Sequence, residues 1–438
     1  MASADALLSW GRRQRERHSC VPISWASDPF PPAGADLPLL PYGCGRSYGD
    51  SCLNAGGTLL LTRGLNRFVE LDRETGRLRC EAGVTLREIL ELVIPTGWFP
   101  AVLPGTSHVT VGGAIANDIH GKNHHVGGTF GASVEAIELL RSDGSRRECS
   151  RDREGGLFAA TIAGLGLTGL VTRATLRLKR VSSPWIAAEA IRFRSLDEFD
   201  ALVTESDRQY EYTVAWLDLA ARETSGPGGI FFRGNHAQPD EARPGFPMAG
   251  RRVRLPADLP DWAISRTAAR AFNWLYMNRP LARRSVVSPW AFFFPLDGIE
   301  GWNRAYGRRG FFQYQAVVPG RRAAEALRPL LDAIRAAPEV ATLTVLKTMG
   351  DVRSPGIMSF PRPGLTLSVD FPDRGPETAR FLSRLSTAAT AAGGAVYPAK
   401  DAVMSGADFR ASFPRWKEFS RHRDPGFSSG FWRRVMHE

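Results

Sequence analysis

Two glycine-rich stretches in the first third of the chain limit the fold most: PYGCGRSYGD at residues 41–50 and PGTSHVTVGGAIANDIHGKNHH at residues 104–125. Glycine has no Cβ atom, so it lets backbone approach a ligand or another chain segment closely. A dinucleotide-binding GxGxxG motif lies between a strand and a helix. Here the third glycine comes one residue late and a strand-like run follows, while in HGKN no Ser or Thr follows the lysine. The pattern therefore excludes a Rossmann motif and a P-loop.

Both stretches nevertheless have the chemistry of a phosphate site. Consecutive turn amides beside Arg46 and Ser47 form the kind of concavity that binds a diphosphate. The second stretch offers small residues, so that a flat ligand can lie against its backbone. Either stretch alone is better explained by tight turns in a β-rich core, whereas the two together favour a large cofactor lying across a domain.

The composition is that of an ordinary globular protein with a sizeable core. The 438 residues are enough for about two or three domains, and 43% are hydrophobic and 23% charged. A net charge of +11 favours anionic partners such as nucleic acid, a membrane surface or a phosphorylated substrate, although composition by itself favours a basic enzyme. The five cysteines lack CxxC spacing, which argues against a disulfide framework and a zinc site and indicates a reducing compartment.

The N-terminal residues lack the apolar core of a signal peptide, and no segment has the roughly 18 apolar residues that span a bilayer. We therefore expect a cytoplasmic protein, and a peripheral position on the inner membrane stays open. Residues 251–290 combine eight arginines with five aromatic residues, which are Trp262, Phe272, Trp274, Tyr276 and Trp290. This mixture suits a bilayer interface or an anionic groove, and equally a solvated helical insertion. No nucleic-acid motif accompanies it, so nucleic-acid binding is not expected.

Short apolar runs between glycine turns predict an α+β fold. In the first part of the chain we expect strands at 58–62, 67–72 and 77–83, a helix at 85–97, a hairpin around Asp143-Gly144 and, within 155–181, a short helix, a glycine-rich turn and a long strand. Beyond residue 184 we expect strands at 310–319 and 364–372 alternating with helices at 321–337 and 377–394. This second set indicates a second α+β domain.

Several motifs together resemble the vanillyl-alcohol-oxidase type of FAD-binding flavoenzyme. They are GCGRSYGDSCLN, PGTSHVTVGGAIANDIHGKNHHVGGTFG and GLGLTGLVTRATL in the first half, with GWNRAYGRRGFFQYQAVVP, SFPRPGLTLSVDFP, GGAVYPAKD and FPRWKEF beyond it. Within that type the chain is most similar to the decaprenylphosphoryl-β-D-ribose oxidase branch. DIHGKNHH and GWNRAYG carry most of this likeness, because GRSYGD is shared with several sugar and lactone oxidases. The resemblance covers nearly the whole chain.

The resemblance implies a two-part FAD-binding domain with an α+β cap. Residues 1–183 and 397–438 would bind FAD, and residues 184–396, including the insertion 251–290, would form the substrate domain. The implied reaction oxidises the 2′-hydroxyl of a polyprenyl-phospho-β-D-ribose to a ketone. This is the first half of an epimerisation to the arabinose donor for cell-envelope polysaccharide, which a separate NADH-dependent reductase would complete.

Two other functions remain open at this point. One is a soluble sugar, alditol or aldonolactone oxidase of the same superfamily, which shares the first glycine-rich stretch but leaves DIHGKNHH unexplained. The other is a protein that binds nucleic acid or anionic lipid and catalyses no reaction.

The resemblance also implies how the cofactor is held. Several members of the superfamily attach FAD covalently through a histidine in the first stretch, and this chain has Arg46 there, so we expect non-covalent FAD. The residues expected to bind the cofactor come from both stretches, from one strand and from the C-terminal part. They are Gly43, Gly45, Arg46, Ser47, Tyr48, Gly49, Asp50, Ser51, Gly105, Thr110, Val111, Gly112, Gly113, Asn117, Asp118, Ile119, His120, Val171 and Tyr397.

Catalytic roles are expected for Lys400, His120 and Tyr48. Oxidation of a secondary alcohol needs a hydride acceptor and a proton acceptor side by side. Lys400 is the expected proton acceptor, because a lysine desolvated beside a flavin has a lowered pKa. From spacing alone a salt bridge with Asp401 would explain Lys400, a structural role would explain His120 and core packing would explain Tyr48. The i,i+4 pair of His120 and His124 is not expected to bind metal, because Gly121 and a non-helical pattern intervene.

Substrate contacts are expected from Lys122, Gln315, Lys347 and Ser368. Lys122 and Lys347 would face phosphate or negative charge on the reduced cofactor, and Gln315 would hydrogen-bond the sugar, although a solvated surface position also explains Lys347. Ser368 stands where mycobacterial members of the branch have cysteine, so we expect thiol-directed inhibitors to fail while the chemistry survives. Phe292, Phe293 and Phe294 replace a more polar pattern, which leaves the exact lipid and sugar open.

Overall fold

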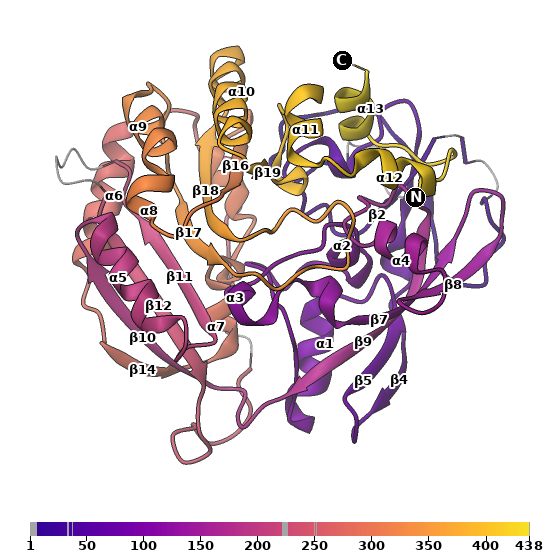
Figure 1. The fold of residues 1–438 in the computed structure, drawn as a ribbon, viewed down its shortest axis with the longest axis horizontal. Helices are drawn as coiled ribbons and strands as arrows, with labels where there is room; N and C mark the ends of the chain where they lie inside the picture. Colours follow the sequence, from indigo (N-terminus) through magenta and orange to yellow (C-terminus); the bar gives the residue numbers. More distant parts are fainter. Residues whose placement is uncertain are drawn as a thin grey trace.

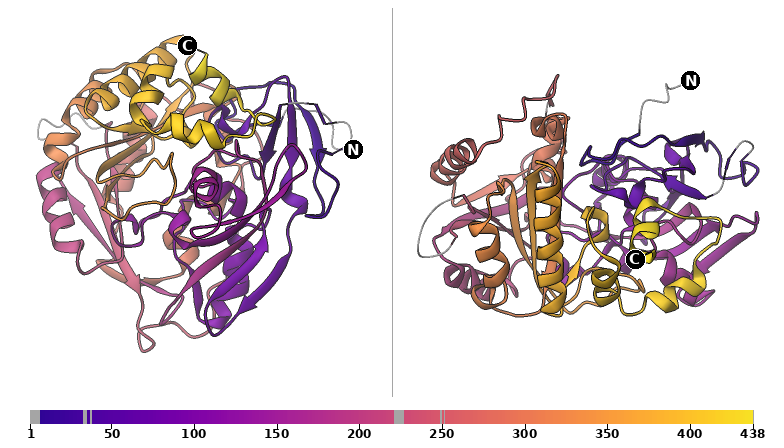
Figure 2. Two further views of the ribbon diagram at one scale, coloured as in Figure 1. Left: turned by 45° about the vertical axis from the view of Figure 1, so that its right-hand side comes forward. Right: turned by 90° about the horizontal axis from the view of Figure 1, so that it is seen from above.

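Two lobes lie side by side in the computed structural model, which describes residues 7–32, 35–36, 38–220, 227–248, 250 and 252–437 (Figure 1). The first lobe, indigo to purple in Figure 1, holds two small sheets. The second lobe, pink to orange, is built on one large sheet. Helices from the C-terminal part, drawn in yellow, lie against the first lobe in both views of Figure 2.

The first lobe contains a parallel three-stranded sheet and a larger antiparallel sheet. The three-stranded sheet has the order β1-β3-β2, and the larger sheet has the order β4-β5-β9-β7-β8 with β6 paired to β9. The strands are β1 (Ser19–Pro22), β2 (Leu39–Tyr42), β3 (Thr58–Leu61), β4 (Phe68–Asp72), β5 (Arg77–Glu81), β6 (Trp98–Pro100), β7 (Val134–Leu140), β8 (Arg146–Ser150) and β9 (Leu170–Arg180). The helices are α1 (Leu86–Val93), α2 (Val111–Ala116), α3 (His124–Gly127) and α4 (Gly155–Thr161), with the 3₁₀ turn η1 (Asp50–Cys52).

Local sequence signals explain the elements that were predicted in this lobe. Thr85 caps α1 in a reciprocal capping box with Glu88, and the predicted apolar face of this helix is buried. The chain leaves the helix through Gly97, whose φ of +78° lies in the left-handed region that glycine tolerates. The hairpin of β7 and β8 turns at Gly144, which also has a positive φ of +80°. The helix, the hairpin and the long strand β9 are therefore confirmed.

The second lobe is an eight-stranded antiparallel sheet covered by helices. Its order is β14-β10-β12-β11-β17-β18-β16-β19. The strands are β10 (Ile186–Phe193), β11 (Tyr212–Leu217), β12 (Gly229–His236), β14 (Arg284–Val287), β16 (Phe311–Val318), β17 (Thr344–Met349), β18 (Gly364–Pro372) and β19 (Ala395–Val396). The helices are α5 (Leu196–Ser206), α8 (Ala323–Ala326), α9 (Arg328–Ala336) and α10 (Pro376–Ala391).

The two faces of this sheet differ in chemistry because successive side chains of a strand alternate between faces. On β16, Phe312, Tyr314 and Ala316 belong to the core that includes apolar side chains of α5, α9 and α10. On β18, Leu367 and Val369 belong to the same core. The intervening residues are polar and lie on the opposite face; they are Gln313, Gln315, Thr366, Ser368 and Asp370. The fold thereby creates a buried polar wall on the face that the helices leave free.

One prediction for this part of the chain was wrong in detail. The helix expected at 321–337 is two helices, α8 and α9, that meet at Leu327. Pro329 explains the break, because proline has no N–H group to continue the backbone hydrogen bonds of α8, while it is tolerated in the first turn of a new helix, where it lies in α9. Within the expected insertion 251–290, β14 pairs with β10 of the large sheet, and the insertion itself remains a prediction.

The remainder of residues 251–290 lies outside the sheet, and Arg251 lies outside the described residues. It contains β13 (Val253–Arg254), which pairs with β15 (Ile299–Glu300), then α6 (Arg266–Asn278) and α7 (Pro289–Phe293). In Figure 1, α6 lies at the edge of the second lobe that is farthest from the first lobe. Within the described ranges no helix has the length and apolar character needed to cross a bilayer.

The C-terminal part returns to the first lobe through α11 (Gly406–Ser412), α12 (Trp416–His422) and α13 (Gly430–Met436). Arg434 of α13 forms ion pairs with Asp50 and Asp401, both at 2.8 Å. Leu39 of β2 forms an isolated bridge with Phe427. These contacts tie the end of the chain to its beginning, and the domain boundaries at residues 183 and 396 remain predictions.

Candidate active site

The two glycine-rich stretches meet in space. A Cβ atom on Gly43 would lie 2.5 Å from Oγ1 of Thr110, the residue that caps α2 by accepting a hydrogen bond from Gly113 N–H. Gly49 approaches the C-terminal part as closely, since a Cβ there would lie 1.7 Å from the Asp401 carbonyl oxygen. Gly45 has a φ of +59°. These glycines are therefore required by contacts between protein segments. Among the glycines of the two stretches, Gly105 alone has no atom within 4 Å of an added Cβ.

Buried polar atoms without partners gather along these stretches. They include Nε of Arg46, Oγ of Ser51 and Oδ1 of Asn117. The Arg46 guanidinium lies 4.0 Å from the Trp10 ring centroid, and burial lowers the pKa of its side chain. A buried polar group without a partner costs about 1–3 kcal/mol, so such groups usually bind a ligand or water. A cationic side chain and unpaired donors beside an open glycine fit a diphosphate-containing cofactor such as FAD.

The other residues expected to bind the cofactor lie around the same region with different exposures. Tyr397 donates its hydroxyl to the Asn117 carbonyl oxygen at 2.9 Å, and its ring stacks on Phe360 at 4.7 Å. The carboxylate of Asp50 forms an ion pair with Arg434. The side chains of Val111, Ile119 and Val171 are buried, while Ser47, Gly112 and Gly113 are partly exposed.

Asp118 does not point its carboxylate into open space. Its Oδ1 accepts a hydrogen bond from Gly131 N–H at 2.9 Å, and its Oδ2 accepts from the hydroxyls of Ser354 and Ser359, each at 2.5 Å. The side chain therefore holds the segment between β17 and β18 against the first lobe. Because both carboxylate oxygens of Asp118 are already hydrogen-bonded, we expect only its backbone to contact the cofactor.

His120 is held between two strands of the polar wall. Nε2 of Gln315 lies 3.0 Å from Nε2 of His120, and Nζ of Lys347 lies 3.1 Å from Nδ1. With the amide donating, Nδ1 carries the ring proton and a neutral Lys347 amine accepts it. Burial and the neighbouring Lys347 hold the pKa of His120 well below its usual value, and burial lowers the pKa of Lys347 to about 7. Oε1 of Gln315 is buried and has no partner.

Lys122 borders this group beside the phenylalanine run. Its ammonium donates a hydrogen bond to the Phe292 carbonyl oxygen and lies 4.5 Å from the centre of that ring. Burial lowers the pKa of Lys122 to about 7. Thr213 of β11 donates its N–H to the Lys122 carbonyl oxygen at 2.9 Å, so the residue lies where the two lobes join.

Lys400 and Tyr48 lie together at the other end of the polar wall. Nζ of Lys400 is 5.5 Å from the Tyr48 ring centroid, and Tyr48 N–H donates to the Ala399 carbonyl oxygen at 2.8 Å. The salt bridge with Asp401 that would have explained Lys400 is not formed, because Asp401 pairs with Arg434. Burial lowers the pKa of Lys400, while the Asp370 carboxylate acts in the opposite direction.

Sequence reasoning missed two members of this site, Asp370 and Gln313. Asp370 is fully buried and accepts a hydrogen bond from Nε2 of Gln313 at 2.5 Å. The signal was present as period-two alternation in FFQYQAVV and GLTLSVDFP, where every second residue is polar inside otherwise apolar strands. Ser368, which was predicted, belongs to the same alternation and lies opposite Gln315 in the ladder.

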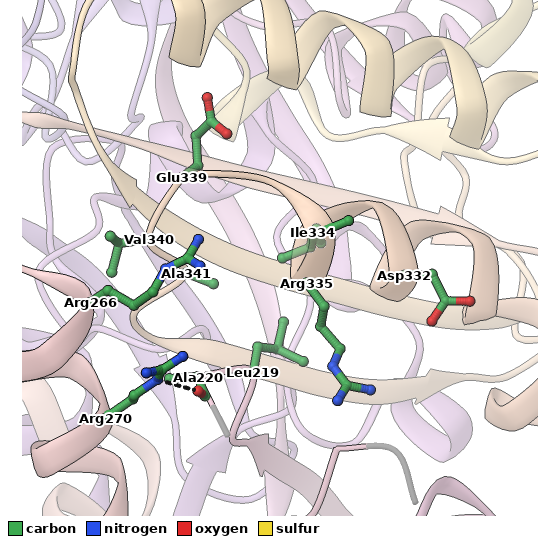
Figure 3. A pocket seen from close by; sticks show the side chains of 11 residues that line it. Leu219, Ala220, Arg266, Arg270, Asp332, Ile334, Arg335, Glu339, Val340 and Ala341 are labelled. Atoms are coloured by element: carbon green, nitrogen blue, oxygen red, sulfur yellow. Dashed lines mark hydrogen bonds between the residues drawn. The ribbon is translucent and has the colours of Figure 1, made fainter. Parts of the chain in front are cut away.

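A separate cavity of about 460 Å³ lies between α6 and α9 (Figure 3). Arg266, Arg270 and Arg335 line it together with Glu339 and Leu219. It shares no residue with the cluster around His120 and Lys400, so it does not belong to the candidate active site.

The comparisons with known proteins agree with this geometry. A family model described as an FAD binding domain matches residues 33–150. The chain is 35% identical to decaprenylphosphoryl-beta-D-ribose oxidase of Mycolicibacterium smegmatis over 91% of this chain and 89% of that protein. It is 34% identical to an uncharacterized protein of Streptomyces coelicolor, over 80% of this chain and all of that one, and 30% identical to mouse L-gulonolactone oxidase over 31% and 30%.

The fold, the matched domain and the cluster of lysines and histidine define an FAD-dependent oxidoreductase. FAD is its cofactor, and the mixed sheets and helices confirm the predicted α+β class. More narrowly, the chain belongs to the family of the Mycolicibacterium decaprenylphosphoryl-beta-D-ribose oxidase.

Proposed function

We propose that the protein oxidises the 2′-hydroxyl of a polyprenyl-phospho-β-D-ribose to the 2′-ketone. The substrate is taken from the name of the Mycolicibacterium relative. The observation that carries the proposal is the gathering of Lys122, Lys347 and Lys400 with His120 next to the FAD-binding stretches. A sugar phosphate supplies both an alcohol for oxidation and an anion for the amines.

The residues divide the work between proton transfer and substrate binding. Bound FAD supplies the hydride acceptor. Lys400, whose pKa burial lowers, takes the proton of the hydroxyl in its neutral form. The unpaired Oε1 of Gln315 accepts a hydrogen bond from the sugar. With a pKa of about 7, Lys122 and Lys347 are each about half-protonated near neutral pH before the substrate binds. An arriving phosphate raises the pKa of both amines and charges them fully.

Anaerobic reduction of the bound flavin tests this function. We expect a farnesyl-phospho-β-D-ribose analogue to bleach the absorption of oxidised FAD and to yield a product with a ketone at C2′. Xylitol and L-gulonolactone are the comparison substrates for the alternative, a sugar, alditol or aldonolactone oxidase. Bleaching by these two and not by the phosphoribose would reverse the assignment. The ketone requires a second enzyme for reduction, and we propose a separate NADH-dependent reductase for that step.

The cofactor is expected to be released from the denatured protein. Arg46 occupies the position at which superfamily members carry the linking histidine, and a guanidinium does not form that bond. Precipitation with trichloroacetic acid should therefore leave nearly all of the yellow colour in the supernatant. Flavin that remains in the washed pellet would contradict non-covalent binding.

We propose that the region around α6 places the enzyme on a membrane surface, where a polyprenyl substrate resides. Trp262, Phe272, Trp274 and Leu275 are all more than 60% exposed, and several arginines of residues 252–284 lie among them. Apolar side chains next to basic ones suit an anionic bilayer interface. The solvated insertion remains the alternative.

Vesicle binding separates the two possibilities. Full burial of a large apolar side chain contributes about 1.5–3 kcal/mol, so the double change Trp274→Ser, Leu275→Ser should weaken binding to phosphatidylglycerol vesicles about tenfold or more. Trp25→Ser is the matched control, since this exposed tryptophan lies in the first lobe. Equal sedimentation of all three proteins with vesicles would contradict a docking role, and FAD binding should be the same in each.

A further inference from the structure

We propose that Asp370 is a positioning residue that stabilises the Lys400 ammonium formed when the substrate hydroxyl gives up its proton. The inference rests on the proposed function for its role in catalysis, whereas the link between the two side chains is a property of the folded chain. Asp370 comes from β18, and Lys400 follows β19, so only the tertiary structure brings them together.

Asp370 differs from the neighbouring carboxylates in its partners. Asp50 and Asp401 share Arg434, and Asp373 pairs with Arg13 at 2.8 Å. Within the described ranges Asp370 has no basic side chain at salt-bridge distance. Its oxygens accept hydrogen bonds from Nε2 of Gln313 at 2.5 Å and, weakly, from the Tyr306 hydroxyl at 3.4 Å.

A fully buried carboxyl with two neutral donors is costly to ionise, and burial accordingly raises the pKa of Asp370 to about 7. Lys400 and Asp370 belong to one cluster, because Nζ of Lys400 lies 5.5 Å from the Tyr48 ring and Gln313, the donor to Asp370, also faces the Tyr48 hydroxyl. Within this cluster Lys400 lowers the pKa of Asp370, and Asp370 raises the pKa of Lys400. Tyr48 and Tyr306 are the other titratable groups that face Asp370. Lys347 and His120 are further titratable groups near Lys400, and Lys400 lowers the pKa of both.

This arrangement fits the charge changes of the reaction. The hydroxyl proton moves to the Lys400 amine while the C–H bond gives its electron pair and hydrogen to the cofactor, so a cation appears where Lys122 and Lys347 already concentrate positive charge. An ionised Asp370 is the acidic side chain that offsets this cation. Removal of the carboxylate should therefore make Lys400 harder to protonate.

The test measures the pKa of Lys400 directly in the FAD-bound protein. Brief labelling with acetic anhydride across a pH series, followed by mass spectrometry of the Lys400 peptide, gives the midpoint of its deprotonation. The neutral amine reacts, so loss of a stabilising carboxylate moves the midpoint to lower pH. We expect a downward shift of about one pH unit in Asp370→Asn. Tyr306→Phe, which weakens ionisation of Asp370, should shift it in the same direction by less.

Asp373→Asn is the matched control, because it removes a carboxylate three residues away that already pairs with Arg13. Its midpoint should equal that of the unchanged protein. An unchanged or upward midpoint in both Asp370→Asn and Tyr306→Phe would overturn the proposal. The pH profile of flavin reduction should show the same downward shift in Asp370→Asn, whereas a merely structural defect would lower the rate at every pH.

The two proposals fail in different ways. If the labelling midpoint shifts but phosphoribose bleaches no flavin in any variant, Asp370 still sets the protonation of Lys400 and the proposed substrate is wrong. If phosphoribose bleaches the flavin and the midpoint does not move, the function stands and the role of Asp370 is overturned.

Discussion

Replacement of Lys400 with methionine should slow anaerobic flavin reduction by about 10²–10⁴-fold, which is the usual contribution of a positioned proton acceptor. Methionine keeps most of the volume of the lysine side chain and removes the amine. Because Lys400 lies beside Tyr48 and pairs with no neighbouring carboxylate at contact distance, its amine is free to take the hydroxyl proton. Stopped-flow absorbance with the farnesyl-phosphoribose analogue measures the rate.

Two further measurements keep this result specific. Lys417→Met removes an exposed lysine of α12 and should leave the rate unchanged. The flavin content of Lys400→Met should equal that of the unchanged protein, so a slow rate with full occupancy locates the defect in the chemical step. A rate within about threefold of the original would exclude Lys400 as the proton acceptor, since that factor is below any general-base contribution.

The second large effect is expected from Arg434→Met, which should lower the free energy of unfolding by at least about 3 kcal/mol. The guanidinium pairs with Asp50 and Asp401, which are only 5% and 4% exposed, and its loss removes the ion-pair partner of two buried carboxylates. Asp50 ends the first glycine-rich stretch and Asp401 follows Lys400. The same change should therefore weaken FAD binding as well as stability.

Urea unfolding with and without added FAD measures both consequences. Arg415→Met is the control, because the pair of Arg415 with Glu418 is exposed at the start of α12 and should contribute no more than about 1 kcal/mol. If Arg434→Met is destabilised no more than Arg415→Met, the ion pairs at Asp50 and Asp401 do not hold the C-terminal part in place.

Short-range interactions allowed part of the secondary structure of this protein to be predicted from its sequence. Thr85 and Glu88 cap a helix because they lie three residues apart, and Gly97 and Gly144 end elements because only glycine adopts a positive φ without strain. Pro329 belongs to the same class of signal, although the helix break that it causes was not predicted. Each of these effects acts within one turn of backbone and needs no knowledge of the rest of the chain.

Sequence motifs also allowed the cofactor to be predicted. The stretches at 41–50 and 104–125 indicated a large cofactor, and the resemblance of several motifs to a flavoenzyme family implied that it is FAD. The matched domain at 33–150 confirms FAD. The sequence did not reveal why the glycines are there. Gly43 and Gly49 lie against Thr110 and Asp401, so their place in the sequence reflects contacts between distant protein segments.

Only the tertiary structure decided which groups share the site. Sequence order places Lys400 next to Asp401, whereas the fold pairs Asp401 with Arg434 and places Lys400 beside Tyr48, in the cluster where Asp370 raises its pKa. The alternation of β16 and β18 shows that their polar residues share one face, but not that this face lies against His120. The physical reason is the sequence distance over which each interaction acts. Helix caps and turns depend on residues that are adjacent in the sequence. Burial, strand order and the electrostatic environment of a lysine depend on segments hundreds of residues apart.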